Sequence, residues 1–314
     1  MAAAVAARIR HFISLADLTP SELAGLIADA AALKREPVPP DAPLRGRSLA
    51  MIFEKPSLRT RVSFEMGMVH LGGHATYLSP AEVGLGRRES VADVARVVSR
   101  YVDLVVLRTF AHETTEEFAR FSAVPVVNGL SDVSHPCQGL TDIFTIQERK
   151  GSAPGIVVAY VGDGNNVCHS LMLAVALAGQ TIRVAAPDGY EPQGRTRSAA
   201  AAIARGTRAT IDVVRDPRDA VRGADVVYTD VWTSMGQEQE YERRRRAFQG
   251  YQVNADLLRL AKPDAVVMHD LPAHRGEEIT DDVMDGPQSV VFDQAENRLH
   301  AQKALVRWLM GVAR

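Results

Sequence analysis

The sequence contains little cysteine, no large excess of charge and no long apolar run. Its 314 residues include two cysteines, Cys137 and Cys168, which form no CxxC pair, so neither a disulfide framework nor a thiolate metal site is indicated. The net charge of −2 provides no bulk attraction to nucleic acid or to an anionic membrane. No stretch approaches the roughly 18 apolar residues of a membrane span. We therefore expect no nucleic-acid partner and no membrane partner.

Signals for export and for metal binding are also missing. The N-terminal segment "MAAAVAARIRHF" lacks the apolar core of a signal peptide, and two reduced thiols fit a reducing compartment, so we expect a cytoplasmic protein. His269 and His274 are five residues apart with a proline between them, which is not the spacing of a helical zinc motif. We expect no metal site.

Short apolar strands alternate with helical segments along the chain, which is typical of an α/β protein with largely parallel sheets. The pattern restarts near residue 150, and the length suffices for two domains. We expect two similar-sized lobes, each a mostly parallel sheet flanked by helices, with the active site in the cleft between them. The expected strands are 48–53, 74–79, 104–109, 124–129, 155–162, 181–187, 210–215, 225–231 and 264–272.

The helix expected after the first strand has the clearest signals. Ser57 is a good N-cap, and two glycines at 72 and 73 are a good stop. Leu58, Val62, Met66 and Val69 are spaced four, four and three residues apart, which predicts one apolar stripe along the helix.

Polar residues that follow the strands of the first lobe are cationic and rich in hydrogen-bond donors. Ligands of parallel sheets bind beyond the carboxyl ends of the strands, and a helix N-terminus with a guanidinium beside it favours phosphate. Each residue also has a plainer explanation: Ser57 as a cap, Arg59 as a solvated charge and His135 as a packing residue. Together they predict an anion site made of Lys55, Ser57, Arg59, Thr60, Arg108, His135 and Gln138.

The corresponding residues of the second lobe are neutral or acidic. Carboxylates at two strand ends suit a ligand that carries an ammonium group better than a second phosphate. Asp230 can alternatively cap a helix, and Asp270 can pair with Arg275. The candidates are Asn166, Asp230, Ser234, Met235, His269 and Asp270.

The segment "VGDGNNV" imitates part of a dinucleotide-binding fingerprint. Gly162 and Gly164 form the G-x-G, and Asp188 follows the next strand. Val167 occupies the third glycine position, where a side chain obstructs close packing of helix and strand. A nicotinamide enzyme is therefore a weak alternative.

Six segments together resemble the aspartate/ornithine carbamoyltransferase family over nearly the whole chain. They are "FEKPSLRTRVSFE", "LRTF", "HPCQGLTDI", "DVWTSMGQE", "LPAHRGEEIT" and "AENRLHAQKAL". Within them, "WTSMG" is typical of the members that act on ornithine rather than aspartate.

The resemblance implies transfer of a carbamoyl group from carbamoyl phosphate to the side-chain amine of L-ornithine, which gives citrulline and phosphate without a cofactor. It implies a carbamoyl-phosphate domain, 1–148, onto which the C-terminal helix, 295–314, packs back, and an ornithine domain, 149–294. It also implies a homo-oligomer, a trimer, in which a neighbour's loop near residues 82–88 completes each site.

The resemblance assigns roles to single residues as well. Catalysis is expected from Arg59, Arg108 and His135, which are donor types that stabilise an oxyanion, and from Asp270, whose role follows from its charge and not from the family pattern. Carbamoyl phosphate is expected to bind Ser57, Leu58, Arg59, Thr60, Arg108, His135, Gln138, Leu271 and Arg298. Ornithine is expected to bind Asn166, Asp230, Ser234, Met235 and Asp270, with 234–236 closing over it.

Three positions depart from the family pattern. Leu58 replaces the threonine of S-T-R-T, Gly84 stands where the neighbour's loop usually carries glutamine, and Asp270 replaces the cysteine of H-C-L-P. Arg87 or Arg88 is a candidate to compensate for Gly84. A carboxylate beside an ammonium raises the pKa of the ammonium and can also accept its proton. We therefore expect Asp270 to face the reacting amine.

Two alternatives stay open at this point. One is a carbamoyltransferase for another amine, such as lysine, putrescine or an acylated ornithine. The other is a binding protein on the same fold without catalytic activity. The sequence also leaves open in which direction the reaction runs in the cell.

Overall fold

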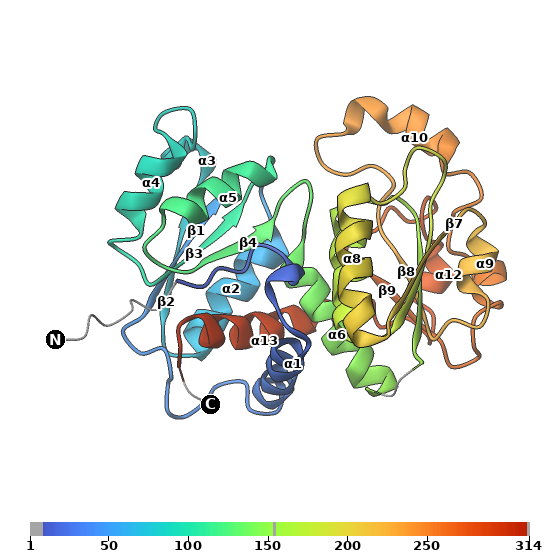
Figure 1. Ribbon diagram of the computed structural model, residues 1–314, viewed down its shortest axis with the longest axis horizontal. Helices are drawn as coiled ribbons and strands as arrows, with labels where there is room; N and C mark the ends of the chain where they lie inside the picture. The colour runs from blue at the N-terminus through green and yellow to red at the C-terminus, as the bar shows by residue number, and fades with distance from the viewer. Residues whose placement is uncertain (1–8, 153–154, 313–314) are drawn as a thin grey trace.

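The computed structural model describes residues 9–152 and 155–312 and shows two α/β lobes that lie side by side (Figure 1). The expected α/β fold with two parallel sheets is confirmed. Residues 1–8, which belong to the N-terminal segment expected to lack a signal peptide, lie outside the described residues. So do residues 313 and 314, the last two of the predicted C-terminal helix.

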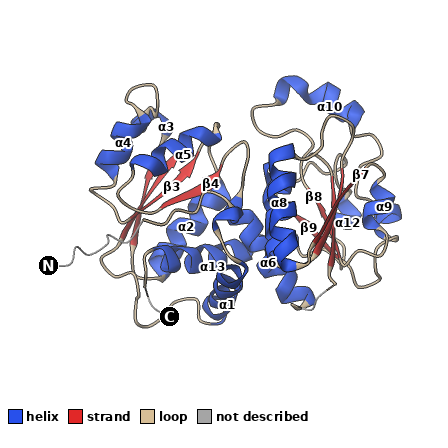
Figure 2. Cartoon of the chain, in the orientation of Figure 1, coloured by secondary structure: helices blue, strands red, loops and turns tan. Residues whose placement is uncertain are grey.

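Each lobe is built around one parallel sheet (Figure 2). The sheet of the first lobe has the order β2-β1-β3-β4, and that of the second has the order β7-β6-β5-β8-β9. All expected strands are present, as β1 (Ser48–Phe53), β2 (His74–Leu78), β3 (Leu104–Arg108), β4 (Val126–Leu130), β5 (Val157–Val161), β6 (Thr181–Ala185), β7 (Thr210–Val214), β8 (Val226–Thr229) and β9 (Val266–His269).

Helices cover the faces of both sheets, and local signals set their ends. Thr19 caps α1 in a capping box with Glu22, and Asn165 caps α7 by accepting from two backbone N–H groups. The longer helices are α1 (Pro20–Arg35), α2 (Leu58–His70), α4 (Val91–Val98), α5 (His112–Phe121), α6 (Pro136–Lys150), α7 (Asn166–Leu177), α8 (Gly194–Thr207) and α13 (Val291–Leu309). The shorter ones are α3 (Pro80–Val83), α9 (Pro217–Val221), α10 (Tyr241–Ala247), α11 (Ala255–Leu258) and α12 (Asp281–Met284).

The apolar stripe predicted on α2 exists, but it faces away from the core. Leu58, Val62, Met66 and Val69 are 77%, 47%, 39% and 55% exposed. The helix instead buries a different face, which includes Thr60 and Phe64. A periodic apolar face shows that a helix has a hydrophobic side, but it does not show which neighbour covers that side.

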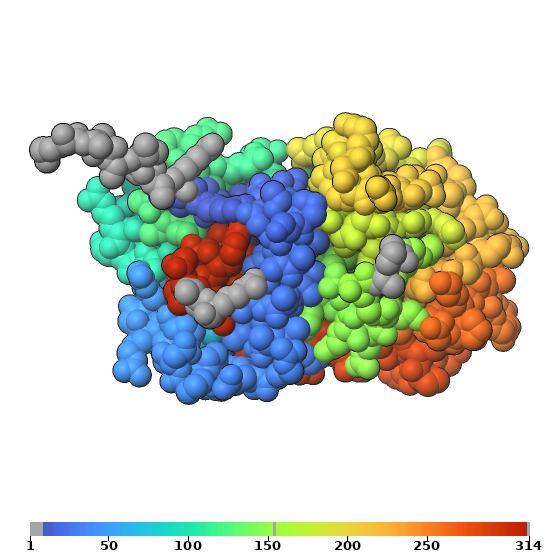
Figure 3. Space-filling view, turned by 60° about the horizontal axis from the view of Figure 1, so that its bottom comes forward, coloured from blue at the N-terminus to red at the C-terminus, as the bar shows by residue number. Residues whose placement is uncertain are grey.

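The C-terminal helix α13 returns to the first lobe and packs against α1, α2 and α6. Figure 3 shows its red surface enclosed by blue segments from the beginning of the chain. Residues from the second half of the sequence thereby reach the first-lobe side of the cleft. Within the described ranges, no helix is long and apolar enough to cross a membrane.

Candidate active site

A cavity of about 750 Å³ lies between the lobes, where the carboxyl ends of both sheets meet. It is wide enough for two small substrates. Thirteen of the predicted site residues line it: Lys55, Ser57, Leu58, Arg59, Arg108, His135, Asn166, Asp230, Ser234, Met235, Asp270, Leu271 and Arg298. Thr60 and Gln138 lie behind this lining and are fully buried.

Three guanidinium groups converge on the first-lobe wall of the cavity. Burial, with a smaller contribution from the nearby charge of Arg298, lowers the pKa of Arg108 to about 10. Burial likewise lowers the pKa of Arg59, although the carboxylate of Asp270 opposes this shift. Since like charges so close together repel one another, an anion bound among them is strongly favoured.

The N-terminus of α2 faces the same point. Ser57 caps this helix by accepting a hydrogen bond from the backbone N–H of Thr60, at 3.3 Å. The first N–H groups of a helix have no acceptor within the helix, and the helix dipole places partial positive charge there. The guanidiniums and the helix end together supply the positive charge and the N–H donors that suit an anion, at the place where the sequence predicts one; anion binding itself stays a prediction.

His135 enters the cavity from the turn between β4 and α6. Its ring is 1% exposed, and burial together with the arginine charges holds the pKa of the imidazole well below its usual range. The ring is therefore neutral and can donate one N–H without adding charge. Within the part of the chain that the structure describes, its Nδ1 has no hydrogen-bond partner.

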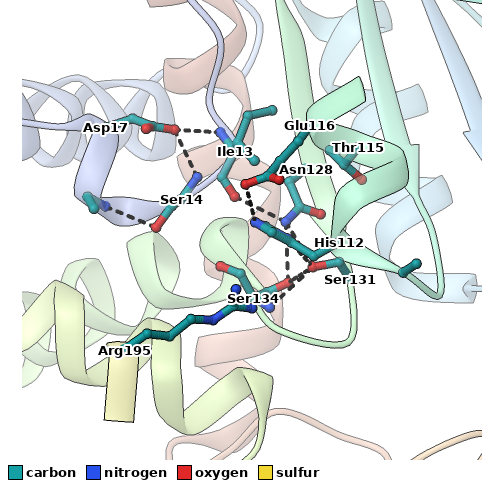
Figure 4. A network of polar contacts seen from close by, with 12 residues as sticks. Ile13, Ser14, Asp17, His112, Thr115, Glu116, Asn128, Ser131, Ser134 and Arg195 are labelled. Carbon is teal, nitrogen blue, oxygen red and sulfur yellow. Dashed lines mark hydrogen bonds and ion pairs between the residues drawn. The ribbon is translucent and has the colours of Figure 1, made fainter. Parts of the chain in front are cut away.

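A polar network fixes the turn that carries His135 (Figure 4). Asn128 donates to the hydroxyl of Ser131, and the backbone N–H of Ser134 donates to the same hydroxyl, at 3.3 and 3.2 Å. The backbone N–H of His135 donates to the hydroxyl of Ser170 at 2.8 Å. Ser170 belongs to α7 of the second lobe, so both lobes contribute to holding this histidine.

Arg298 of α13 links groups from both lobes. Its Nη2 donates to the hydroxyl of Thr60 at 2.8 Å, and its Nη1 lies 4.0 Å from Oδ1 of Asp270. The side chain is 3% exposed. Asp270 therefore lies beside Arg298 and not beside Arg275, which instead pairs with Asp281 and Asp285.

The loop after β9 brings a backbone carbonyl into the cavity. Leu271 has a φ of 64°, a left-handed conformation that is strained for a leucine. Its N–H donates to Nδ1 of His269, and Nε2 of His269 lies 3.0 Å from Oε1 of the buried Glu278. These contacts hold the carbonyl oxygen of Leu271 toward the first lobe, where Arg59 donates to it at 2.6 Å.

Two carboxylates form the acidic wall. Burial, with a smaller contribution from the charge of Asp270, raises the pKa of Asp230 to about 7. Burial also raises the pKa of Asp270, whereas Arg298 and Arg59 oppose that shift. Asn165 donates to Oδ2 of Asp230 at 2.8 Å and keeps this carboxylate in place. A cation beside the pair allows both groups to stay ionised.

Two residues of the pattern that resembles a dinucleotide fingerprint are engaged by other parts of the protein. A Cβ added at Gly164 would lie 2.2 Å from the backbone nitrogen of Pro192. Asp188, the candidate ribose partner, pairs with Arg215 at 2.8 Å. The backbone thus packs directly on Gly164, and Asp188 is already paired, so neither residue supports the nicotinamide alternative.

Several residues at the site were not among those assigned to it from the sequence. Glu238, Tyr241 and His274 line the cavity. Glu238 and Tyr241 lie several residues beyond the predicted strand 225–231, so the strand-end rule does not find them, whereas His274 follows the predicted strand 264–272 by two residues and is not among the candidates. His274, Glu277 and Glu278 bring potential metal ligands within 4.8 Å of one another, but one oxygen of Glu278 already accepts from the backbone N–H of His274.

The segment 82–88 forms a turn outside this cavity. Gly84 ends α3 with a φ of 58°, where a side chain would be strained. Arg88 donates to the carbonyl of Glu82, and Arg87 lines a separate small pocket. The suggested compensation for Gly84 by Arg87 or Arg88 stays a prediction.

A two-lobed α/β protein with an anion site facing an acidic site across its cleft is thus defined by fold and geometry. Residues 10–148 match the family description "Aspartate/ornithine carbamoyltransferase, carbamoyl-P binding domain", and residues 154–309 match "Aspartate/ornithine carbamoyltransferase, Asp/Orn binding domain". The chain belongs to the aspartate/ornithine carbamoyltransferase family.

Similar proteins cover nearly the full length. The chain is 56% identical to an ornithine carbamoyltransferase of Acidothermus cellulolyticus, over 97% of this chain and 98% of that protein. It is 53% identical to a protein of Pyrococcus furiosus named "Ornithine carbamoyltransferase, anabolic", over 96% of each chain. The solved structure of ornithine carbamoyltransferase from Pyrococcus furiosus superposes with a TM-score of 0.94 at 52% identity, covering 98% of each chain.

Proposed function

We propose that this chain transfers the carbamoyl group of carbamoyl phosphate to the side-chain amine of L-ornithine, giving L-citrulline and phosphate. One observation carries the proposal: three guanidiniums and a helix N-terminus face two carboxylates across a single cavity. This arrangement suits an anionic donor and a cationic acceptor held next to each other. The relative that is named anabolic supports the direction toward citrulline.

The phosphate of the donor binds at the N-terminus of α2, with Ser57, Arg59 and Arg298 around it. The carbonyl oxygen of the donor faces Arg108 and the neutral His135. As the amine attacks the carbonyl carbon, negative charge develops on this oxygen, and donors already in place stabilise it. Removing one such donor typically slows a reaction by about 10²–10³-fold.

The acceptor binds at the acidic wall. Asp230 faces the α-ammonium group, and Asn166, Ser234 and Met235 hold the rest of the amino-acid end. Asp270 faces the side-chain ammonium first as a counter-ion and then accepts its proton. The freed amine forms the new C–N bond, the C–O bond to phosphate breaks, and inorganic phosphate leaves from the helix end. Holding both substrates in line can supply about 7–11 kcal/mol of the barrier reduction.

The active assembly is proposed to be a homo-oligomer, a trimer as in the family pattern. The exposed stripe of α2 supports contact with a second copy, because a contiguous apolar face on a surface helix is typical of an interface. The stripe begins at Leu58, which also lines the cavity. A neighbouring copy that covers the stripe therefore lies at the edge of the site.

Another amine is the runner-up acceptor. The carboxylate of Asp230 is held in place by the amide nitrogen of Asn165 at 2.8 Å. A fixed carboxylate at this position favours an acceptor with a free α-ammonium group. Putrescine has no α-amino-acid end, and an acylated ornithine has a neutral amide in place of the α-ammonium group. Lysine has both features but is one methylene longer, which a cavity distinguishes only by about 10–200-fold.

The test is citrulline formation by the purified protein from carbamoyl phosphate and L-ornithine. Lysine, putrescine, N-acetylornithine and aspartate are assayed in parallel by phosphate release above a blank without amine. We expect a rate with ornithine far above the others. Release with none of the amines, although carbamoyl phosphate binds, would instead favour the non-catalytic alternative.

A further inference from the structure

A buried carboxyl group lies directly behind the cavity and has no role in the mechanism above. Asp142 of α6 is 0% exposed, and its Oδ1 accepts hydrogen bonds from three side chains. The donors are Nε2 of Gln138 at 2.9 Å, Nε2 of Gln294 at 2.8 Å and the hydroxyl of Tyr228 at 3.4 Å. These three come from α6, α13 and β8.

The hydrogen bond from Gln138 to Asp142 determines which end of the Gln138 amide has no hydrogen-bond partner. Gln138 lies in the first turn of α6, and the N-cap of this helix is His135, which lines the cavity. Because the amide nitrogen donates to Asp142, the amide oxygen is the free end, and it has no partner among the described residues. A buried acceptor without a donor is costly, which indicates that a ligand supplies the donor.

The carbamoyl group offers a donor of the right kind. In carbamoyl phosphate, the phosphate and the carbonyl oxygen accept hydrogen bonds. Its amino group is the only part that can donate a hydrogen bond to Gln138. A rotated Gln138 amide would present its nitrogen there and lose this discrimination.

The same carboxyl group also reaches the opposite side of the site. Gln294 uses its nitrogen for Asp142 and its oxygen to accept from the backbone N–H of His269 at 2.9 Å. His269 precedes Asp270 and Leu271 in the loop that brings the leucine carbonyl into the cavity. Because Nε2 of Gln294 also donates to the hydroxyl of Tyr228 at 3.0 Å, this support of the Leu271 loop does not depend on Asp142, and the effect of Asp142 falls on Gln138.

We propose that Asp142 is a positioning residue that holds the Gln138 amide with its oxygen toward the carbamoyl amino group. It thereby selects carbamoyl phosphate over acyl phosphates that lack this amino group. The inference rests on the proposed function and names the specificity device of the same site.

Burial agrees with this role. Burial and, to a smaller extent, the charge of Asp270 raise the pKa of Asp142 to about 8, although the hydrogen bonds from the three donors oppose the shift. A carboxyl group that stays neutral at pH 7 still accepts through its carbonyl oxygen. An asparagine can replace it in this function, but a leucine of similar volume cannot.

The experiment compares two ligands that differ in one group. Phosphonoacetamide carries the amino group, and 2-oxopropylphosphonate has a methyl group in its place. Their Kd values are measured by calorimetry for the parent and for Asp142→Asn, Asp142→Leu and Asp142→Ala. The alanine variant is included in case Asp142→Leu does not fold. Alanine leaves a space that water can fill.

We expect the parent and Asp142→Asn to prefer the amide. In Asp142→Leu and Asp142→Ala, the amide should bind about tenfold more weakly, as expected for one lost hydrogen bond. The Kd of the ketone should change by less than twofold. In a Gln138→Leu background, substituting Asp142 should leave the amide-to-ketone ratio unchanged.

Other results separate the possible failures. If the parent binds neither ligand, the proposed function fails, and the inference fails with it. If the parent prefers the amide but the leucine and alanine variants keep that preference, Asp142 has no positioning role. An equal loss of both ligands, or a further loss of preference in the Gln138→Leu background, likewise overturns the inference.

Discussion

Nη2 of Arg59 donates a 2.6 Å hydrogen bond to the carbonyl oxygen of Leu271, across the cleft between the lobes. Arg59 lies in the first turn of α2, and Leu271 lies in the loop after β9. The contact joins the anion site to the loop that carries Asp270. A charge-assisted hydrogen bond of this length also fixes the guanidinium plane before any substrate arrives.

Replacing Arg59 by lysine should therefore impair catalysis although the positive charge is kept. An ammonium has no rigid fork of donors and cannot bind both the phosphate and Leu271 in the same geometry. We expect kcat to fall by about 10²-fold or more, on the scale of losing one transition-state donor. Steady-state kinetics measure this, with Arg61→Lys as the control on the solvent side of the same helix. Equal kcat values for Arg59→Lys and the parent would contradict this role.

Removing the charge at Asp270 should shift the pH dependence of activity. Burial and the Asp270 carboxylate together raise the pKa of Asp230 to about 7. The mechanism requires ionised Asp230, so kcat/KM should rise with pH through that range. In Asp270→Asn the pKa of Asp230 falls, because a negative neighbour is lost, and the acidic limb moves to lower pH. We also expect kcat to fall, since the proton acceptor is gone.

Asp270→Cys restores the family residue and is the second variant for this test. A thiol is neutral in the acidic range, so the acidic limb should move as in Asp270→Asn while more activity is kept. A pH profile that is the same in the parent and in both variants would show that Asp270 does not act on the titrating groups.

The buried pair of Arg244 and Asp163 should stabilise the wall next to the 234–240 loop. Nη1 of Arg244 lies 2.8 Å from Oδ2 of Asp163, with both side chains under a tenth exposed, and it also donates to the carbonyl of Trp232. Replacing Arg244 by methionine leaves a buried carboxylate without its cation, which typically costs about 3–5 kcal/mol.

Thermal and denaturant unfolding measure this loss of stability. Arg245→Met, at the exposed next position, is the matched control and should leave stability within about 0.5 kcal/mol of the parent. The double variant Asp163→Asn/Arg244→Met should recover part of the loss, because no charge is then left buried. If Arg244→Met lowered the free energy of unfolding no more than Arg245→Met does, the pair of Arg244 and Asp163 would not stabilise this wall.

Charges placed on the exposed stripe of α2 should break the assembly. Val62→Glu and Val69→Glu put carboxylates on a face that the proposed oligomer covers, so light scattering after gel filtration should give a smaller mass than for the parent. Val38, which is 60% exposed in a loop, supplies the control substitution Val38→Glu. A parent that is already monomeric, or unchanged masses in both variants, would contradict the proposed contact.

The sequence predicts the strands well because parallel strands buried on both faces are continuous apolar runs with polar residues directly after them. That rule also finds Arg108, His135, Asp230 and Asp270. It does not find Tyr241, because a loop that runs well beyond the end of β8 brings this residue to the cavity.

The three-way contact at Asp142 lies beyond sequence reasoning for a similar reason. Gln294 is 152 residues away from Asp142 along the chain. A buried aspartate inside an apolar helix is visible as an exception, but its partners are not. The sequence likewise does not predict which side of α2 meets solvent. The spacing of the apolar residues identifies one face of the helix but not the element that covers it.

The return of α13 to the first lobe has a consequence for the order in which the site is made. The anion site depends on Arg298, and α1 packs against the same helix. During synthesis from the N-terminus, the first lobe emerges from the ribosome long before these residues do. Its sheet can form early, but its phosphate site is completed only when almost the entire chain has been translated.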